Sequence, residues 1–173
     1  ISEGKIIGRC VGRAEFGARA LGNRSIIADP RRLDIVRRIN DSIKNRDFWM
    51  PFAPSILAER ESDYLVNKKN IAAPYMTQAF ETTELAKKDL IAGLHQADLT
   101  SRPQVLNRQQ NPEYHDLVSA FQEVTGVGGV LNTSFNLHGE PIVQSPEDAA
   151  RVFRISNMDM LILDGCVIEK NDR

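Results

Sequence analysis

Strand-like and helix-like segments are interspersed along this chain, and this order is the strongest limit on its fold. Short apolar runs bounded by Gly, Pro or polar residues predict strands, whereas apolar residues at spacings of three and four predict helices. The two kinds of segment do not alternate strictly. We therefore expect an α/β (α+β) domain in which helices pack on a twisted mixed sheet. The predicted strands are 5–11, 25–28, 52–57, 75–82, 102–107, 128–132, 160–163 and 166–169.

Three predicted helices have clear start signals. Asp29 is the expected N-cap of the first, with Pro30 in its first turn. The second runs from Asn111-Pro112 to Gly126, and the third begins at Ser145 with acids in its first turn. Segment 59–66 is predicted to be a short helix. Segment 84–93 is predicted to be a helix or an irregular turn. The expected inward-facing residues are Leu33, Val36, Ile39 and Ile43 in the first helix, Leu117, Val118, Phe121 and Val124 in the second, and Ala149, Val152 and Phe153 in the third.

The run GRAEFGARALGNRS, residues 12–25, has neither a helical nor a strand period, and it holds three arginines, three glycines and one glutamate. Its backbone can turn sharply, and arginine binds phosphate or carboxylate through paired hydrogen bonds. One interpretation is an anion site in which Arg13, Arg19 and Arg24 bind the ligand and Glu15 orients one of them. The alternative is a loop held in shape by contacts of arginine with Glu15 and with backbone carbonyls.

The charge distribution favours a local anion site. The net charge of −1 gives no overall attraction to nucleic acid or membrane, yet residues 9–46 hold nine arginines and Lys44 against four acids. Lys44 and Arg46 end the basic helix just before the apolar, proline-rich stretch 50–54, where charges would be poorly screened. Capping of the helix end by these cations is the alternative.

Cysteine usage and the chain ends carry little functional information. Cys10 and Cys166 match no metal or redox spacing, so we expect two ordinary thiols in a reducing cytoplasm. No long apolar run or signal peptide occurs. Because the chain begins with Ile1 and enters a predicted strand at once, we expect it to be a fragment of a longer protein.

Two polar segments beside predicted strands add candidate residues. In HQADLTSRPQ, residues 95–104, Arg102 is the best candidate for a ligand contact, whereas His95 and Asp98 are more often structural in such a stretch. In VLNTSFNLHGEP, residues 130–141, an apolar strand runs into Asn132-Thr133-Ser134. Ligands of open α/β sheets bind at the carboxyl ends of strands, although a turn that ends the strand is the alternative.

Several site classes lack their motifs. His138 and Glu140 have no metal-ligand spacing, so no metal site is expected in this chain. Neither a P-loop nor a Rossmann glycine motif occurs, and there is no nucleophile elbow. Few aromatic residues interleave with the basic segment, which argues against a platform for stacking nucleic-acid bases.

An ordered set of motifs resembles the C-terminal domain of the nodulation-type O-carbamoyltransferases, a family that includes enzymes tailoring cephamycin, novobiocin and tobramycin. The motifs are GRAEFGARALGNRSIIADPR, INDSIKNRDFWMPFAPSIL, PYM, RPQ and LNTSFNLHGEPIVQSPEDAARVF, and they span nearly the whole chain. The resemblance implies a YrdC-like fold over residues 1–173, preceded by an actin-like ATPase-type domain that carries a metal. It also implies that this domain makes carbamoyl-adenylate from carbamoyl phosphate and ATP with Mg, and that the preceding domain transfers the carbamoyl group to a hydroxyl of a small-molecule acceptor.

Carried over by motif position, the ligand-binding residues of the family fall on Arg19, Lys44, Arg102, Asn132 and Ser134. The three cations would stabilise charge at phosphorus, and the two neutral side chains would bond a carbamoyl amide or an adenylate oxygen. Thr133 and the other arginines of the basic segment, Arg13, Arg24 and Arg46, complete the predicted binding set.

The chain departs from the family pattern in two places. Met50 stands where many members have Arg, and we expect Arg46 or Arg24 to compensate. The segment around His95 and Asp98 is also looser than the family motif. A non-catalytic nucleotide- or anion-binding regulatory module is an alternative function. An RNA-binding module is a weaker one, because the charge is near neutral and aromatic residues are sparse.

Overall fold

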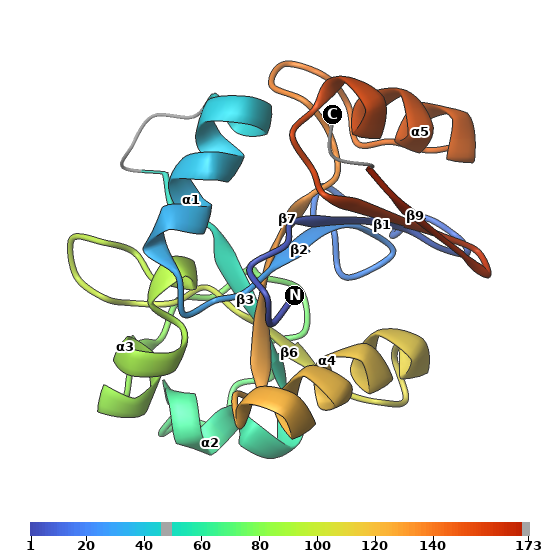
Figure 1. Ribbon diagram of the computed structural model, residues 1–173. Coiled ribbons are helices and arrows are strands. Elements are labelled where there is room, and N and C mark those ends of the chain that lie inside the picture. The colour runs from blue at the N-terminus through green and yellow to red at the C-terminus, as the bar shows by residue number, and fades with distance from the viewer. Residues whose placement is uncertain (46–49, 171–173) are drawn as a thin grey trace.

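The computed structural model describes residues 1–45 and 50–170, and its centre is a seven-stranded sheet in the order β6-β3-β7-β2-β1-β8-β9 (Figure 1). Neighbouring strands are antiparallel except for two parallel pairs, β1 with β8 and β3 with β6. This mixed sheet with helices packed on it confirms the expected fold class. The strands are β1 Ile7–Cys10, β2 Arg24–Ala28, β3 Ala53–Leu57, β6 Gln104–Leu106, β7 Gly129–Ser134, β8 Met160–Leu163 and β9 Cys166–Glu169.

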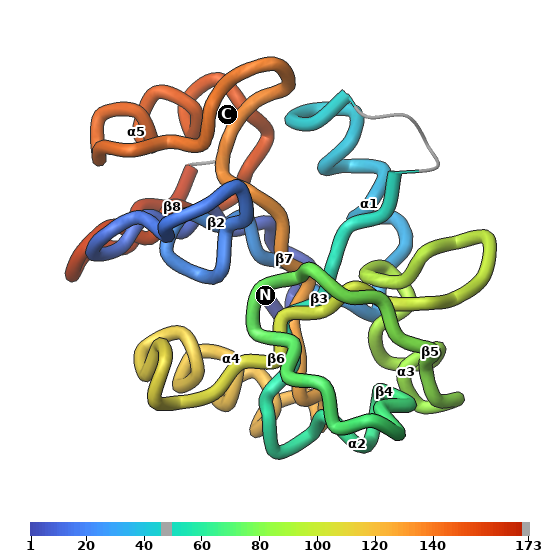
Figure 2. The backbone as a smooth tube through the Cα atoms, turned by 180° about the vertical axis from the view of Figure 1, so that it is seen from behind, coloured from blue at the N-terminus to red at the C-terminus, as the bar shows by residue number. Residues whose placement is uncertain are grey.

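Helices cover both faces of the sheet (Figure 1). On one face lie α1 Leu33–Ile39, which continues as a π-helix over Asn40–Lys44, and α5 Pro146–Ile155. On the other lie α2 Glu61–Tyr64, α3 Glu84–Asp89 and α4 Pro112–Thr125. Two short 3₁₀ turns, Ala58–Arg60 and Ile91–Gly93, adjoin α2 and α3. A small second sheet, β4 Leu65–Val66 with β5 Glu81–Thr82, lies next to α2 and α3 (Figure 2).

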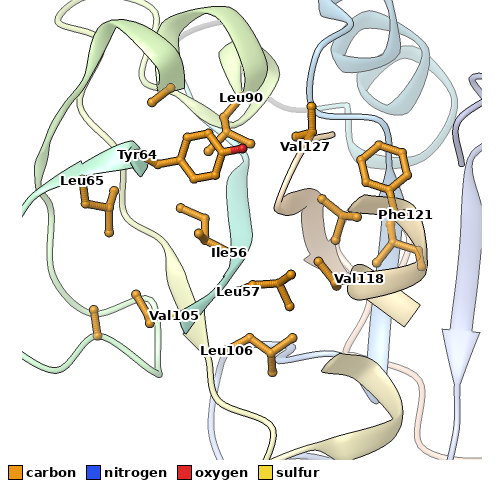
Figure 3. Packing of buried hydrophobic residues seen from close by; sticks show 14 of the residues in the cluster. Ile56, Leu57, Tyr64, Leu65, Leu90, Val105, Leu106, Val118, Phe121 and Val127 are labelled. Atoms are coloured by element: carbon orange, nitrogen blue, oxygen red, sulfur yellow. The ribbon is translucent and has the colours of Figure 1, made fainter. Parts of the chain in front are cut away.

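The alternation of side chains along the strands builds two separate cores. Ile27 of β2 points into the cluster under α2, α3 and α4, whereas its neighbours Ile26 and Ala28 point into the cluster under α1 and α5. Figure 3 shows the first cluster, in which Leu57 and Ile56 of β3 lie between Tyr64 and Val118. Burying both faces fixes the register of every central strand, because a slip of one residue would exchange the two sets.

The start of α1 differs from the prediction. Asp29 is buried but does not cap the helix; its carboxylate accepts hydrogen bonds from the backbone N–H and the guanidinium of Arg31. The helix begins later, after Arg32, without a side-chain cap. Ile35, which the expected stripe omitted, is buried, whereas Leu33 is 49% exposed. The delayed start rotates the buried stripe to Ile35, Ile39 and Ile43.

For the other elements, some predictions are confirmed and some are wrong. The start of α5 after Ser145 and the strands β8 and β9 are confirmed, as are the inward-facing residues of α5. The strand expected over 75–82 is wrong: only the bridge at Phe80 and the short β5 form there. Val124 is 74% exposed, because α4 ends one turn beyond its contact with the sheet. No helix of the described part of the chain could span a membrane.

Candidate functional site

A small cavity gathers residues from five separate parts of the sequence. Its volume is about 50 Å³, and it lies beside the carboxyl end of β7. The walls come from the loop after β1, the start of β3 and the residues before it, the segment before β5, the residue Arg102 just before β6, and the end of β7. The polar lining residues were all candidates from the sequence: Arg19, Arg102, Asn132, Thr133 and Ser134. The other lining residues are apolar: Ala18, Ala20, Pro51, Phe52, Ala53 and Met76.

Two cations face this cavity. Arg19 is exposed, while Arg102 is half-buried and donates a hydrogen bond of 2.7 Å to the carbonyl of Met76. Burial lowers the pKa of Arg102 from its ordinary value, and the nearby positive charge of Arg19 lowers it further. Within residues 1–45 and 50–170, no carboxylate forms a salt bridge with either arginine. Two like charges held together in this way favour an anion between them.

Asn132 forms the floor of the cavity and is 1% exposed. Its side-chain N–H groups donate to the hydroxyl of Ser55 at 2.9 Å and to the carbonyl of Ala20 at 3.2 Å. The third contact of the amide nitrogen is the side-chain oxygen of Gln104, at 3.3 Å. The side-chain oxygen of Asn132 has no hydrogen-bond partner among the residues that the structure describes.

Lys44 is buried behind the cavity and does not line it. Its ammonium donates to the backbone carbonyls of Ser134 (2.6 Å) and Asn136 (3.0 Å), and to the side-chain oxygen of Asn136 (2.7 Å). The Ser134 hydroxyl lies 3.2 Å away. Lys44 thus makes its described contacts with the end of β7 and the residues just after it. Its contacts fix the end of β7 and the position of Ser134, and a contact with ligand stays a prediction.

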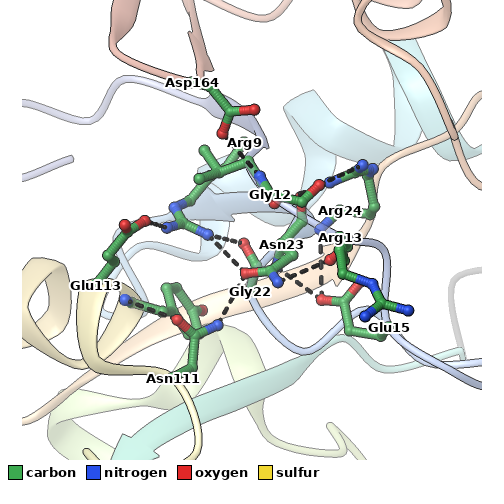
Figure 4. A network of polar contacts seen from close by, with 12 residues as sticks. Arg9, Gly12, Arg13, Glu15, Gly22, Asn23, Arg24, Asn111, Glu113 and Asp164 are labelled. Carbon is green, nitrogen blue, oxygen red and sulfur yellow. Dashed lines mark hydrogen bonds and ion pairs between the residues drawn. The ribbon is translucent and has the colours of Figure 1, made fainter.

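The loop after β1 is pinned at its base, as Figure 4 shows. One oxygen of the Glu15 carboxylate accepts from the backbone N–H groups of Leu21 (2.7 Å), Asn23 (2.7 Å) and Arg24 (3.4 Å). Arg24 is buried, and its guanidinium donates to four carbonyls, those of Val11, Gly12, Asn23 and Gln144.

Three expectations about this loop change accordingly. Glu15 holds the backbone and does not orient an arginine. The terminal nitrogens of the Arg24 guanidinium are directed to backbone carbonyls, and a phosphate contact of Arg24 in place of the one expected at Met50 stays a prediction. Arg13 is exposed and does not line the cavity, and Arg46 lies outside the described residues. Arg19, on the exposed tip of the loop, is the arginine of this run that faces the cavity.

Arg9, which sequence reasoning had passed over, anchors the loop to α4 (Figure 4). It is buried on β1 and donates to the carbonyl of Gly22 at 2.7 Å and to the side chain of Asn23 at 3.1 Å, with Glu113 of α4 at 3.4 Å. Asn111, the N-cap of α4, also donates to Asn23. An arginine inside an apolar strand is the signal that could have identified this anchor.

A second cavity, of about 200 Å³, shares Pro51, Phe52 and Arg102 with the first. His95 and Asp98, together with the short segment that joins them to Arg102, form its polar side, and Ala79 and Gly93 add to its apolar side. The Asp98 carboxylate accepts from the backbone N–H and hydroxyl of Thr100 and lies 3.0 Å from Nδ1 of His95. The Thr100 bonds and the imidazole lower the pKa of Asp98. Asp98 therefore stays an acceptor, which directs the Nδ1 proton toward it and leaves Nε2 for other partners.

Metal ligands do not gather in the described part of the chain: it contains no group of three His, Cys, Asp or Glu side chains that could hold an ion. His138 has a structural contact, because its Nδ1 lies 2.7 Å from the carbonyl of Lys44. Cys10 is buried and Cys166 exposed, both as free thiols.

Comparison with known proteins gives matches over nearly the whole chain. Residues 1–170 match the family model described as Carbamoyltransferase C-terminus. Nodulation protein NolO of Bradyrhizobium diazoefficiens is 40% identical over 98% of this chain and 31% of its own length. The 3'-hydroxymethylcephem-O-carbamoyltransferase of Amycolatopsis lactamdurans is 34% identical over 86% of this chain and 27% of its own length. An uncharacterized protein of Methanocaldococcus jannaschii is 42% identical, and the chain again spans only 27% of it.

Proposed function

Because this chain belongs to the carbamoyltransferase C-terminus family, we propose that it is the part of an O-carbamoyltransferase that joins carbamoyl phosphate and ATP as carbamoyl-adenylate. The atom balance requires water to cleave inorganic phosphate from carbamoyl phosphate first. The resulting carbamate attacks the α-phosphorus of ATP, and pyrophosphate leaves. Transfer to an acceptor hydroxyl belongs to the remainder of a longer protein, since the matched relatives are three to four times as long as the matched region.

The observation that carries this proposal is the pair Arg19 and Arg102, which face one cavity without a carboxylate partner among the described residues. Adenylation gathers negative charge at phosphorus, and catalysis of such a step consists mainly of positioning and charge stabilisation. Guanidinium groups positioned at the reacting phosphate supply that stabilisation without a protein nucleophile. The neutral Asn132 and Ser134 beside them suit a carbamoyl group.

We assign the second cavity to the nucleoside of ATP. Its volume of about 200 Å³ suits a planar base, and Phe52 and Pro51 offer apolar contact. His95, with Nδ1 directed to Asp98, keeps Nε2 as an acceptor for an amino group. Arg102 belongs to both cavities, so it lies where a phosphate chain would pass from the nucleoside to the carbamoyl group.

The test is pyrophosphate release by the full-length protein that contains this sequence. Release should require both ATP and carbamoyl phosphate, and Arg19→Ala or Arg102→Ala should lower kcat/KM at least a hundredfold, because each removes a charge aimed at phosphorus. Arg37→Ala, on the exposed face of α1, is the matched control and should keep the rate. Binding of ATP without turnover in any condition would instead favour a regulatory nucleotide-binding module.

A further inference from the structure

Three buried side chains on neighbouring strands form one directed hydrogen-bond chain under the first cavity. Ser55 on β3 is paired in register with Gln104 on β6, and Asn132 lies on β7, the other neighbour of β3. All three are at most 4% exposed. Buried polar groups at such positions weaken a core unless they satisfy one another, so their presence requires a reason.

The direction of this chain is set by backbone carbonyls at its two ends. Gln104 donates its side-chain N–H to the carbonyl of Leu21 at 2.9 Å, so its oxygen must face the other way. That oxygen accepts from the Ser55 hydroxyl at 2.6 Å, and the Ser55 oxygen in turn accepts from the Asn132 amide nitrogen at 2.9 Å. A backbone carbonyl can only accept, so the carbonyl of Ala20, 3.2 Å from the Asn132 nitrogen, favours the same orientation at the other end.

The consequence lies at the other end of the chain. The Asn132 nitrogen is bound to Ser55, Gln104 and the carbonyl of Ala20, whereas its oxygen is buried without a partner among the described residues, on a side chain that lines the cavity. A buried acceptor without a partner is costly. The site therefore demands a hydrogen-bond donor at this point, and the small volume beside Arg19 requires that the donor belong to a small group.

We propose that Ser55 and Gln104 are positioning residues that present the Asn132 oxygen to the amino group of the carbamoyl moiety, and that they thereby select carbamoyl over acetyl phosphate. This inference rests on the proposed function. The acetyl group has the same size but carries a methyl in place of the NH₂, so it would leave the Asn132 oxygen unpaired. A site built to bond a donor rejects the analogue that lacks it far more strongly than a size filter could.

The experiment compares kcat/KM for pyrophosphate release with carbamoyl phosphate and with acetyl phosphate, in the full-length protein. Wild type should prefer carbamoyl phosphate at least a hundredfold. In Gln104→Met, the Ser55 hydroxyl loses its acceptor and Asn132 loses its contact with the Gln104 oxygen, so the Asn132 amide is held less firmly in its orientation. The preference should fall at least tenfold, through loss with carbamoyl phosphate, while the value for acetyl phosphate stays within about twofold.

One further variant keeps the test decisive. Ser55→Ala removes a single hydroxyl, should lower the preference as Gln104→Met does, and decides the matter if Gln104→Met does not fold. An unchanged preference in both Gln104→Met and Ser55→Ala would overturn the inference, even if both substrates became slower. Wild type that uses the two phosphates equally would also overturn it, whereas no release with carbamoyl phosphate would refute the proposed function itself.

Discussion

Replacing Lys44 by Met separates a structural role from a ligand contact. The substitution keeps the length and apolar volume of the side chain but removes the ammonium, which is 2% exposed and donates to oxygens of Ser134 and Asn136. If Lys44 fixes the end of β7, its loss should destabilise the fold as well as reduce activity. A pure ligand contact would affect activity alone.

The expected cost follows from the contacts. Three hydrogen bonds from a charged donor contribute about 1.5–3 kcal/mol each, or roughly 4–9 kcal/mol together. Burying the ammonium costs several kcal/mol, which the substitution recovers. The net loss should be about 2–4 kcal/mol, because two backbone carbonyls remain buried without their donor. For a chain of this size that corresponds to a fall in Tm of roughly 5–15 °C.

The assay is thermal and urea unfolding of the 173-residue chain, read together with pyrophosphate release by the full-length protein. Arg19→Met is the matched variant: Arg19 is exposed, so the free energy of unfolding should change by less than about 0.5 kcal/mol while activity is lost. If Lys44→Met unfolds at the wild-type midpoint, the reasoning from its hydrogen bonds is refuted.

Three further changes test other parts of the structure. Gly22→Ala should destabilise the chain by about 2–4 kcal/mol, because the backbone φ is +123° and the new Cβ would lie 2.4 Å from Tyr114. Gly17→Ala has φ +134° but open space around the new Cβ, so it should cost only the backbone strain, about 1–2 kcal/mol, in the same unfolding assay. The backbone N–H groups of Ser145 and Gln144 hold the pKa of Asp148 below its ordinary value of 3.8. The ionised carboxylate therefore contributes fully to the stability of the fold above that pH, and this contribution is lost as the pH falls through the lowered pKa. The difference in urea midpoint between wild type and Asp148→Ala should stay constant from neutral pH to about pH 5 and shrink below about pH 4. His95→Ala should raise KM for ATP about three- to tenfold, the worth of one neutral hydrogen bond, and an equal rise for carbamoyl phosphate would contradict the assignment of the second cavity.

Much of the fold could be predicted because local signals agreed with the tertiary structure. The Ser145–Asp148 capping box and the turn between β8 and β9 fix their elements within a few residues, so no distant contact is needed to identify them. The prediction failed where a local signal had a competitor. Asp29 resembles an N-cap, but the neighbouring guanidinium of Arg31 binds its carboxylate, and the helix starts later.

The candidate site was predicted as a set of residues but not as a geometry. Arg19, Arg102, Asn132 and Ser134 were all singled out, and all line one cavity. Sequence reasoning could not separate residues that face the cavity from residues that support it, because that distinction depends on burial. Ser55 and Gln104 lie inside two of the quoted motifs, but no role could be assigned to either, since one polar residue inside a strand looks incidental until its neighbour across the sheet is known.

Burial also explains why the arginines of one short run have different roles. A loop without regular secondary structure leaves backbone carbonyls without partners, and a guanidinium has five donors with which to satisfy them. Arg24 is buried at the base of the loop, where it donates hydrogen bonds to four such carbonyls, so its guanidinium stabilises the fold. Arg19 is on the exposed tip, where the backbone is solvated and makes no such demand. The same residue type therefore stabilises the loop at one end and keeps its charge available for an anion at the other, and the pinned base holds the tip over the cavity.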